Sequence, residues 1–252
     1  MLEIVTHCWS GDAVPIYHLM LQLQLSSLIL NPPAVETRYT LFFTEDDRRT
    51  KQVIEAFIDK ANLYVDVNLQ QLDKSCLFRR SIGRHQAALA TTADVVWFTD
   101  VDYLFYDNSI RQANDACMIS EAELVYPDIV HHHRNHFLGD KLLENAESKP
   151  GEVMSINPDE FRPKSYLIAI GGIQIVKGDF CREHGYAKRR LRRRPVNPDL
   201  GFQKCRGDAD FRKMLTKPRE RIELNTVYRI RHSRCGRDGG KYDHSLGKRM
   251  IK

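Results

Sequence analysis

The chain has 252 residues, 42% of them hydrophobic and 28% charged, with a formal net charge of +5. These values are typical of one globular domain with a substantial core, which excludes a small scaffold held together by disulfides or a structural metal. No apolar run reaches the roughly 18 residues of a membrane span, and the first residues lack the basic region and cleavage site of a signal peptide. Six cysteines without a close CxxC pair favour reduced thiols. We expect a cytoplasmic protein, and peripheral association with the inner membrane stays open as an alternative.

Strands and helices alternate in the first hundred residues. Short runs rich in β-formers predict strands at 2–8, 38–44, 63–69 and 94–98, and helical spacing of apolar residues predicts helices at 13–30, 50–61 and 79–93. Such alternation predicts βαβ units and a mostly parallel sheet. Trp97 and Phe98, on the fourth strand, are expected in the core.

The second half is less regular. We expect a strand within Ala122–His133 and another over Ser165–Phe180, interrupted by Gly171 and Gly172. Glycines inside a strand mark a bulge or a close approach of another group. A helix is expected to begin at Asp208, where an aspartate is also a preferred N-cap.

Two acids follow the fourth predicted strand, at Asp100 and Asp102. Burying an ionised carboxylate without a partner is costly, so something must compensate them. In parallel α/β sheets, ligands bind beyond the carboxyl ends of the strands. Hard divalent ions take oxygen ligands and complete their coordination with water and phosphate. A complex of Mn²⁺ or Mg²⁺ with a diphosphate would therefore compensate the two acids.

The segment RSIGRHQAALATTADVVWFTDVDYLF, Arg80 to Phe105, resembles the central block of GT-A fold glycosyltransferases, especially the large family 2 group. Three later segments resemble that family in the expected order: GGIQIVKGDF, CRGDADFRKML and RIRHS. The resemblance implies an α/β, GT-A-like (Rossmann-like) fold with a mixed, mostly parallel sheet flanked by helices. It also implies a hexosyltransferase-type enzyme that moves a sugar from a nucleotide-diphosphate sugar, UDP-sugar favoured, to an acceptor hydroxyl, with inversion.

The resemblance also implies roles for single residues. Asp100 would contact the ribose or the metal, Asp102 would bind the metal, and His232 would bind the metal or the diphosphate. Asp208 would be the general base, with Asp210 as the alternative. Thr6, Arg84 and Val101 would help to bind the nucleotide sugar, and Gly171 and Gly172 would line the acceptor side. Residues 1–108 would form the nucleotide-sugar-binding half of one catalytic domain, and residues 109–252 the acceptor-binding half with its basic C-terminal segment.

The sequence departs from the family pattern at two places. The turn after the second strand reads TEDDRR, so the residue that recognises the nucleotide base is not identified. The acidic helix start reads Gly207-Asp208 where the family has Glu-Asp.

Other metal sites remain open from the residues alone. Cys181, His184, His232 and Cys235 have a spacing that permits a zinc tetrad, which would compete for His232. His131–His133 with His136 could bind a metal, although such a run is more typical of a partly exposed loop.

Positive charge is concentrated in Lys188–Arg194, with six cations in seven residues, and in Arg229–Arg237, with four more. Basic clusters attract polyanions or simply lie on solvated loops. This keeps a second class of function open: a nucleic-acid-binding protein, or a metal-dependent nuclease that uses Asp100 and Asp102. It also suggests a glycosyltransferase with an anionic acceptor.

Overall fold

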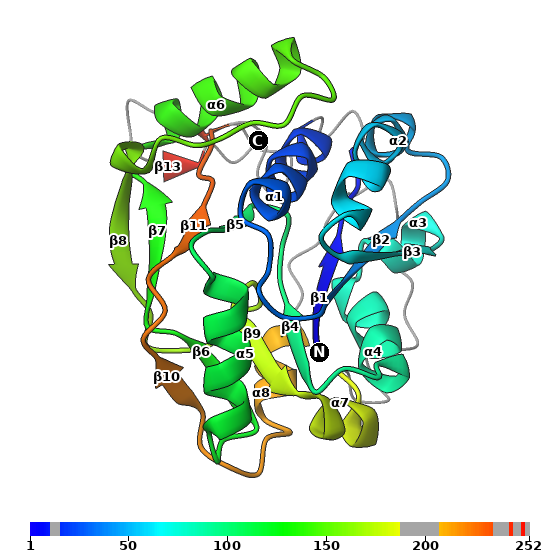
Figure 1. Cartoon of the computed structure of the whole chain (residues 1–252), viewed down its shortest axis with the longest axis vertical. Coiled ribbons are helices and arrows are strands. Elements are labelled where there is room, and N and C mark those ends of the chain that lie inside the picture. Colours follow the sequence, from blue (N-terminus) through cyan, green and yellow to red (C-terminus); the bar gives the residue numbers. More distant parts are fainter. Residues whose placement is uncertain (11–15, 187–206, 234–241, 244–247, 250–252) are drawn as a thin grey trace.

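The computed structural model describes residues 1–10, 16–186, 207–233, 242–243 and 248–249. In this part of the chain the larger sheet has seven strands in the order β10-β6-β9-β4-β1-β2-β3 (Figure 1). Their bounds are β1 (Leu2–His7), β2 (Thr37–Phe43), β3 (Asp66–Gln71), β4 (Val95–Phe98), β6 (Leu124–Pro127), β9 (Gln174–Lys177) and β10 (Glu220–Ile222). Strand β9 runs antiparallel to β4 and β6, whereas the other neighbours are parallel. The predicted α/β class with a mixed, mostly parallel sheet is confirmed.

A second, four-stranded sheet has the order β5-β11-β7-β8. It consists of β5 (Tyr103–Phe105), β11 (Val227–Arg229), β7 (Ile129–His133) and β8 (Phe161–Ser165). The strands β12 (Tyr242–Asp243) and β13 (Lys248–Arg249) form a separate pair. Strand β5 begins directly after the two acids, so the turn between β4 and β5 joins the two sheets.

The helices are α1 (Tyr17–Leu30), α2 (Arg48–Asn62), α3 (Lys74–Leu77), α4 (Arg80–Ala90), α5 (Ser109–Ile119), α6 (His136–Ser148), α7 (Gly178–His184) and α8 (Gly207–Arg212), with a 3₁₀ turn at Pro158–Glu160. Helix α1 packs against α2, α6 and β5, and α4 packs against β1, α7 and α8 (Figure 1). Among the described residues, none of these helices has the length and apolar character needed to cross a bilayer.

Helix α1 is buried on nearly every side, which is unusual for a helix on a sheet. Its central residues, including Gln22, Gln24, Ser26 and Ser27, are all buried. A helix enclosed all round needs apolar side chains in every direction, and its polar side chains must find partners inside the protein. Gln24 finds its partners in the turn after β4, whereas Gln22 finds them in the segment after α6.

The first four strands and the helices between them lie where the sequence predicts, apart from shifts at their ends. The third strand begins at Asp66 and not at Leu63, and the short helix α3 was not expected. Trp97 and Phe98 are fully buried, as predicted for core residues. Trp97 packs edge-on against Phe105 of the second sheet, with ring centroids 5.0 Å apart.

Two expectations for the second half are met only in part. The segment Ala122–His133 holds two strands, β6 and β7, in different sheets. Asp128 lies between them, and its main chain bonds to Ile222 and Tyr166 of neighbouring segments. The expected strand over Ser165–Phe180 is present only in part, because β8 ends at Ser165 and β9 covers only Gln174–Lys177. The glycine pair therefore lies in the connection before β9.

The histidine run is a strand and not an exposed loop. His131–His133 form the end of β7, and both His132 and His133 are buried. His133 stacks on Phe161 at 3.9 Å between ring centroids, and His131 packs against Tyr228. Burial therefore lowers the pKa of His132 to about 3 and of His133 to about 4, with nearby cations adding to the effect at His132.

Candidate active site

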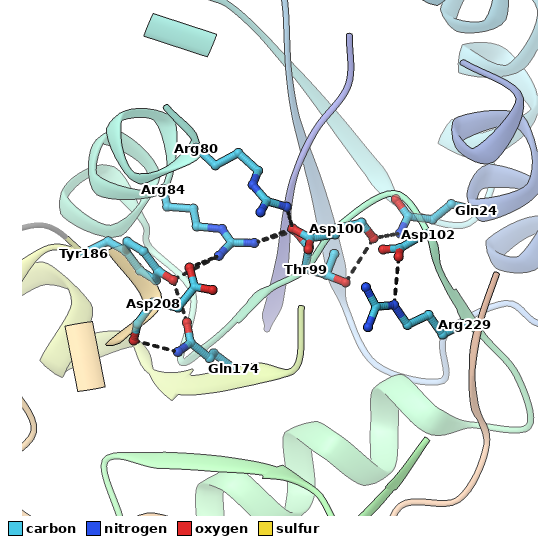
Figure 2. Close-up of polar contacts among 10 residues, drawn as sticks. All are labelled: Gln24, Arg80, Arg84, Thr99, Asp100, Asp102, Gln174, Tyr186, Asp208 and Arg229. Carbon is cyan, nitrogen blue, oxygen red and sulfur yellow. Dashed lines mark hydrogen bonds and ion pairs between the residues drawn. The ribbon is translucent and has the colours of Figure 1, made fainter. Parts of the chain in front are cut away.

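The two acids lie in the turn that leaves β4. Gln24 of the buried helix α1 holds this turn, because its side-chain amide donates to the carbonyls of Asp100 (3.0 Å) and Tyr103 (2.7 Å). Tyr39 on β2 in turn donates its hydroxyl to the Gln24 amide oxygen at 2.6 Å. The turn is thus fixed from the core side, and its two carboxylates meet arginines (Figure 2).

Asp100 is compensated by two arginines of α4. Its Oδ1 atom accepts from Arg80 and, at 2.9 Å, from Nη2 of Arg84. The two arginines are four positions apart, so they lie on the same face of the helix. Burial opposes the charged form of each guanidinium. For Arg80, the negative charges of Asp100 and Asp208 outweigh burial and raise its pKa. For Arg84, the Tyr186 hydroxyl and Asp100 do the same.

Arg84 links Asp100 to Asp208 (Figure 2). Its side chain is only 1% exposed, and Nη1 lies 3.7 Å from Oδ1 of Asp208. The same guanidinium donates to the hydroxyl of Tyr186 (2.9 Å) and to the carbonyl of Thr99 (2.9 Å). A planar, permanently charged fork suits such a position, where several acceptors must be held at fixed directions.

The loop before β9 leaves room for Asp208. A Cβ atom on Gly171 would lie 2.3 Å from Oδ2 of Asp208, and one on Gly172 would lie 2.2 Å from the ring of Tyr103. Gln174 also contacts the carbonyl of Asp208 at 3.4 Å. The predicted close approach at the two glycines is therefore present, although the strand begins only after them, at Gln174.

Aromatic packing fixes helix α8, which carries Asp208. Phe211 of α8 stacks on Tyr186 with ring centroids 4.4 Å apart, and both side chains are fully buried. Tyr186 donates its hydroxyl to Gln174 at 2.6 Å. The Asp208 side chain itself is 30% exposed, so a ligand can reach it.

Asp102 has a separate partner on the second sheet. Its Oδ2 accepts from Nε of Arg229 at 2.8 Å, while its Oδ1 is buried and has no hydrogen-bond partner among the described residues. Arg229 lies over the ring of Tyr103, 5.0 Å from the centroid. Burial lowers the pKa of Arg229, but Asp102 and the hydroxyls of Tyr103 and Tyr166 prevail and raise it well above the usual value.

The two acids offer oxygen ligands to a divalent ion. Among the described residues, no three His, Cys, Asp or Glu side chains gather as a metal site, so Asp100, Asp102 and His232 do not form a ready three-ligand set. Mg²⁺ and similar ions are often held by one or two carboxylates, with water and phosphate as the other ligands. The unpartnered Oδ1 of Asp102 is a free oxygen ligand of the required kind.

The other predicted site residues do not join the contacts among Asp100, Arg84 and Asp208. Thr6 is fully buried at the end of β1, and its hydroxyl has no partner among the described residues. Val101 is 5% exposed and belongs to the core. Asp210 pairs with Lys213 at 3.8 Å and not with Arg84. His232 lies beyond β11, where its carbonyl meets the ring of His136.

Two further predictions fall partly outside the described residues. Cys235, the last member of the zinc tetrad, and the basic run Lys188–Arg194 both lie there. Cys181 is buried in α7, and burial raises the pKa of its thiol well above the usual value.

Sequence reasoning missed most of the partners of the predicted acids. Arg80, Gln24 and Arg229 each hold the turn that carries Asp100 and Asp102. One signal was available for Gln24, since a glutamine between leucines in the run LMLQLQLSSL has to be satisfied inside the core.

Comparison with known proteins supports the fold assignment. No protein-family model matches the chain, and neither does any curated protein. S. aureus TarS 1–349 in complex with UDP-GlcNAc has a TM-score of 0.56 and 11% identity, over 94% of this chain and 60% of that chain. The mannosyltransferase PcManGT from Pyrobaculum calidifontis, in complex with GDP-Man and Mn²⁺, has a TM-score of 0.52 and 11% identity, over 91% and 56%. The longer TarS structure gives 0.55 and 10%, over 91% and 36%.

This chain thus spans 36% to 60% of the length of these three similar chains. At such low identity the likeness concerns the fold. The chain has a GT-A-like α/β fold, as the sequence predicts.

Proposed function

We propose that this chain is a glycosyltransferase that moves a sugar from a nucleotide-diphosphate sugar, UDP-sugar favoured, to an acceptor hydroxyl. One observation carries the proposal: Asp100, Arg84 and Asp208, from three separate parts of the chain, meet beyond the carboxyl end of β4. In open α/β sheets this is where ligands bind. The similar fold of TarS holds UDP-GlcNAc, and that of PcManGT holds GDP-Man with Mn²⁺.

The donor would lie against residues 1–108. Asp102 and Asp100 would hold Mn²⁺ or Mg²⁺, with His232 as a further ligand of the metal or diphosphate. When bound, the ion would neutralise charge on the leaving diphosphate. Thr6 at the end of β1 and the backbone at Val101 would contact the nucleotide. Because Arg84 is almost fully buried, it would serve the donor chiefly by holding Asp100.

The acceptor would lie against residues 109–252, near Gly171 and Gly172. The Asp208 carboxylate would take the proton from the acceptor hydroxyl, and that oxygen would attack the anomeric carbon. The bond from that carbon to the diphosphate breaks, and its electron pair leaves on the phosphate oxygen. Attack opposite the leaving group would invert the anomeric configuration. Asp208 is favoured over Asp210 because it alone of the two pairs with Arg84.

A thermal-shift screen of nucleoside diphosphates and their sugars, each with Mn²⁺ and with chelator, tests this function. A ligand that binds only the folded chain raises Tm by mass action, by the equivalent of about 2.7 kcal/mol at a hundred times Kd. We expect a metal-dependent shift with UDP or a UDP-sugar. A flat screen with salt-sensitive binding to DNA or RNA would instead support the nucleic-acid alternative.

The variant Asp102→Ala tests the metal ligand in the same screen. We expect it to fold and to lose the metal-dependent part of the shift. If the variant retains full metal dependence, the two acids are not the metal site. Asp115→Ala, which removes an exposed acid on α5, provides the control.

A further inference from the structure

One face of the second sheet carries a concentration of cations. Arg162 and Lys164 lie two residues apart on β8, so both point to the same face. Strand pairing places Arg162 opposite His132, and His132 opposite Arg229. Arg231 follows two residues after Arg229. We call Arg162, Lys164 and Arg231, together with the paired residues His132 and Arg229, the basic face.

Three of the four cations of the basic face have no acidic partner in the part of the chain that the structure describes. Among the described residues, Arg229 pairs with Asp102, but Arg162, Lys164 and Arg231 form no ion pair with a carboxylate. The cations also act on one another. Burial, with the fields of Arg231, Arg229 and Arg162, lowers the pKa of Lys164. Like charges that gather without compensation favour an anionic ligand.

The basic face is continuous with the candidate active site. Lys164 lies over the ring of Tyr166, 5.6 Å from the centroid, and the Tyr166 hydroxyl meets Nε2 of His132 at 2.8 Å. Arg229 lies one strand further and pairs with Asp102. The strands β8, β7 and β11 lie side by side (Figure 1). A ligand on the basic face would therefore adjoin the turn that carries the acids.

Two buried polar atoms between the basic face and the acids lack hydrogen-bond partners among the described residues. His132 is 3% exposed, and its Nδ1 makes no hydrogen bond in the described part of the chain. The same holds for the hydroxyl of Tyr103, which is fully buried below Arg229. Buried polar groups are normally satisfied by protein, water or a ligand.

We infer that the basic face binds a phosphate group carried by the acceptor. This inference rests on the proposed function, which places the donor diphosphate at Asp100 and Asp102, on the far side of Arg229. A phosphate matches the face because it carries up to two negative charges and several acceptor oxygens, which arginine can bind in bidentate fashion. The acceptor hydroxyl would then be held toward Asp208 by an ionic contact at a distance from the reacting atoms.

The test measures binding of inorganic phosphate to the full chain by isothermal titration at low ionic strength, with UDP and Mg²⁺ present to occupy the donor site. The double variant Arg162→Gln/Lys164→Gln removes two exposed cations of the basic face. The control Arg111→Gln/Lys217→Gln removes the same charge from exposed positions outside the second sheet. Glycerol, which is uncharged, serves as the negative ligand.

We expect saturable phosphate binding by the wild type and the control, weakened at least ten-fold in the β8 variant, while the UDP-induced shift in Tm stays the same in all three. An equal loss in both variants, or no phosphate binding by the wild type, would overturn the inference. The two proposals can fail separately. Phosphate binding lost only in the β8 variant, without any response to UDP, would retain the anion site and refute the donor assignment.

Discussion

At the scale of single residues, Asp208 and Asp210 lie two positions apart and meet different partners. Asp208 lies beside Arg84, and Asp210 beside Lys213. We expect Asp208→Asn to bind donor normally and to lower kcat by a factor of about 10² to 10⁴, the usual contribution of a general base. Asp210→Asn should retain activity within a few-fold. Release of nucleoside diphosphate from the donor measures both variants, and the opposite ranking would move the base to Asp210.

The two glycines before β9 give a second matched pair. In Gly171→Ala, the new methyl group would collide with the Asp208 carboxylate, so we expect transfer activity to fall more than stability. In Gly172→Ala, the methyl group would meet the buried ring of Tyr103, and overpacking should lower the free energy of unfolding by about 1–3 kcal/mol. Urea unfolding and turnover, measured on both variants, separate the effects. Equal losses of activity and stability in the two would show that neither glycine has a specific role at Asp208.

At the scale of elements, two buried glutamines of α1 serve different parts of the molecule. Gln24 donates to the turn with Asp100, whereas Gln22 donates to the carbonyls of Lys149 and Glu152 beyond α6. We expect Gln24→Leu and Gln22→Leu each to lose stability, by about 1–3 kcal/mol for each buried carbonyl left unpaired. Only Gln24→Leu should also weaken donor binding, because only it releases the turn.

Urea unfolding gives the stabilities, and titration with UDP gives the affinities of the two glutamine variants. If Gln22→Leu weakens UDP binding as much as Gln24→Leu, the turn is sensitive to α1 as a whole and not to this one contact.

The first four strands could be predicted because strands buried on both faces of a parallel sheet give continuous apolar runs. The same reasoning placed Asp100 and Asp102 at the carboxyl end of β4. It failed for the segment around Asp128, where an apolar run continues across a turn into another sheet. A continuous apolar run does not show which of the two sheets a strand joins, because both sheets bury their strands.

The partners of the acids could not be predicted for a different reason. Arg229 lies 127 residues from Asp102 in sequence and meets it only because β11 pairs with β5. Arg84 was predicted near the donor from the resemblance, but its link to Asp208 depends on α4, α7 and α8 packing together. Contacts of this range follow from tertiary packing, which local periodicity does not encode.

At the scale of the whole molecule, buried histidines make stability depend on pH. Burial is the main cause that lowers the pKa of His7, His18, His131, His132 and His133. His7 is 4% exposed, stacks on Phe42 at 4.8 Å, and has no hydrogen bond at either ring nitrogen in the described part of the chain. Arg84 and Arg80 further disfavour its protonation.

These histidines should make the protein less stable as pH falls below about 6.5, their ordinary pKa when unfolded. Below that pH these histidines bind protons in the unfolded chain but not in the folded chain. The free energy of unfolding therefore drops by up to about 1.4 kcal/mol per pH unit for each such histidine. The loss continues until the folded-state pKa is reached, about 4 for His133 and about 3 for His132. Well above pH 7 all are neutral in both states and contribute no slope.

Urea unfolding at pH 7.5, 6.5 and 5.5 would measure this slope in a range where carboxylates, with an ordinary pKa near 4, contribute little. His7→Phe provides the matched variant, since it keeps a ring against Phe42 and removes one titrating group. The larger ring lowers or raises stability equally at every pH. The slope between pH 6.5 and 5.5, however, should decrease by about 1 kcal/mol per pH unit, somewhat under the full value for one histidine. An unchanged slope would mean that His7 is protonated within the fold, beside Arg80 and Arg84, and that the site can admit a further cation.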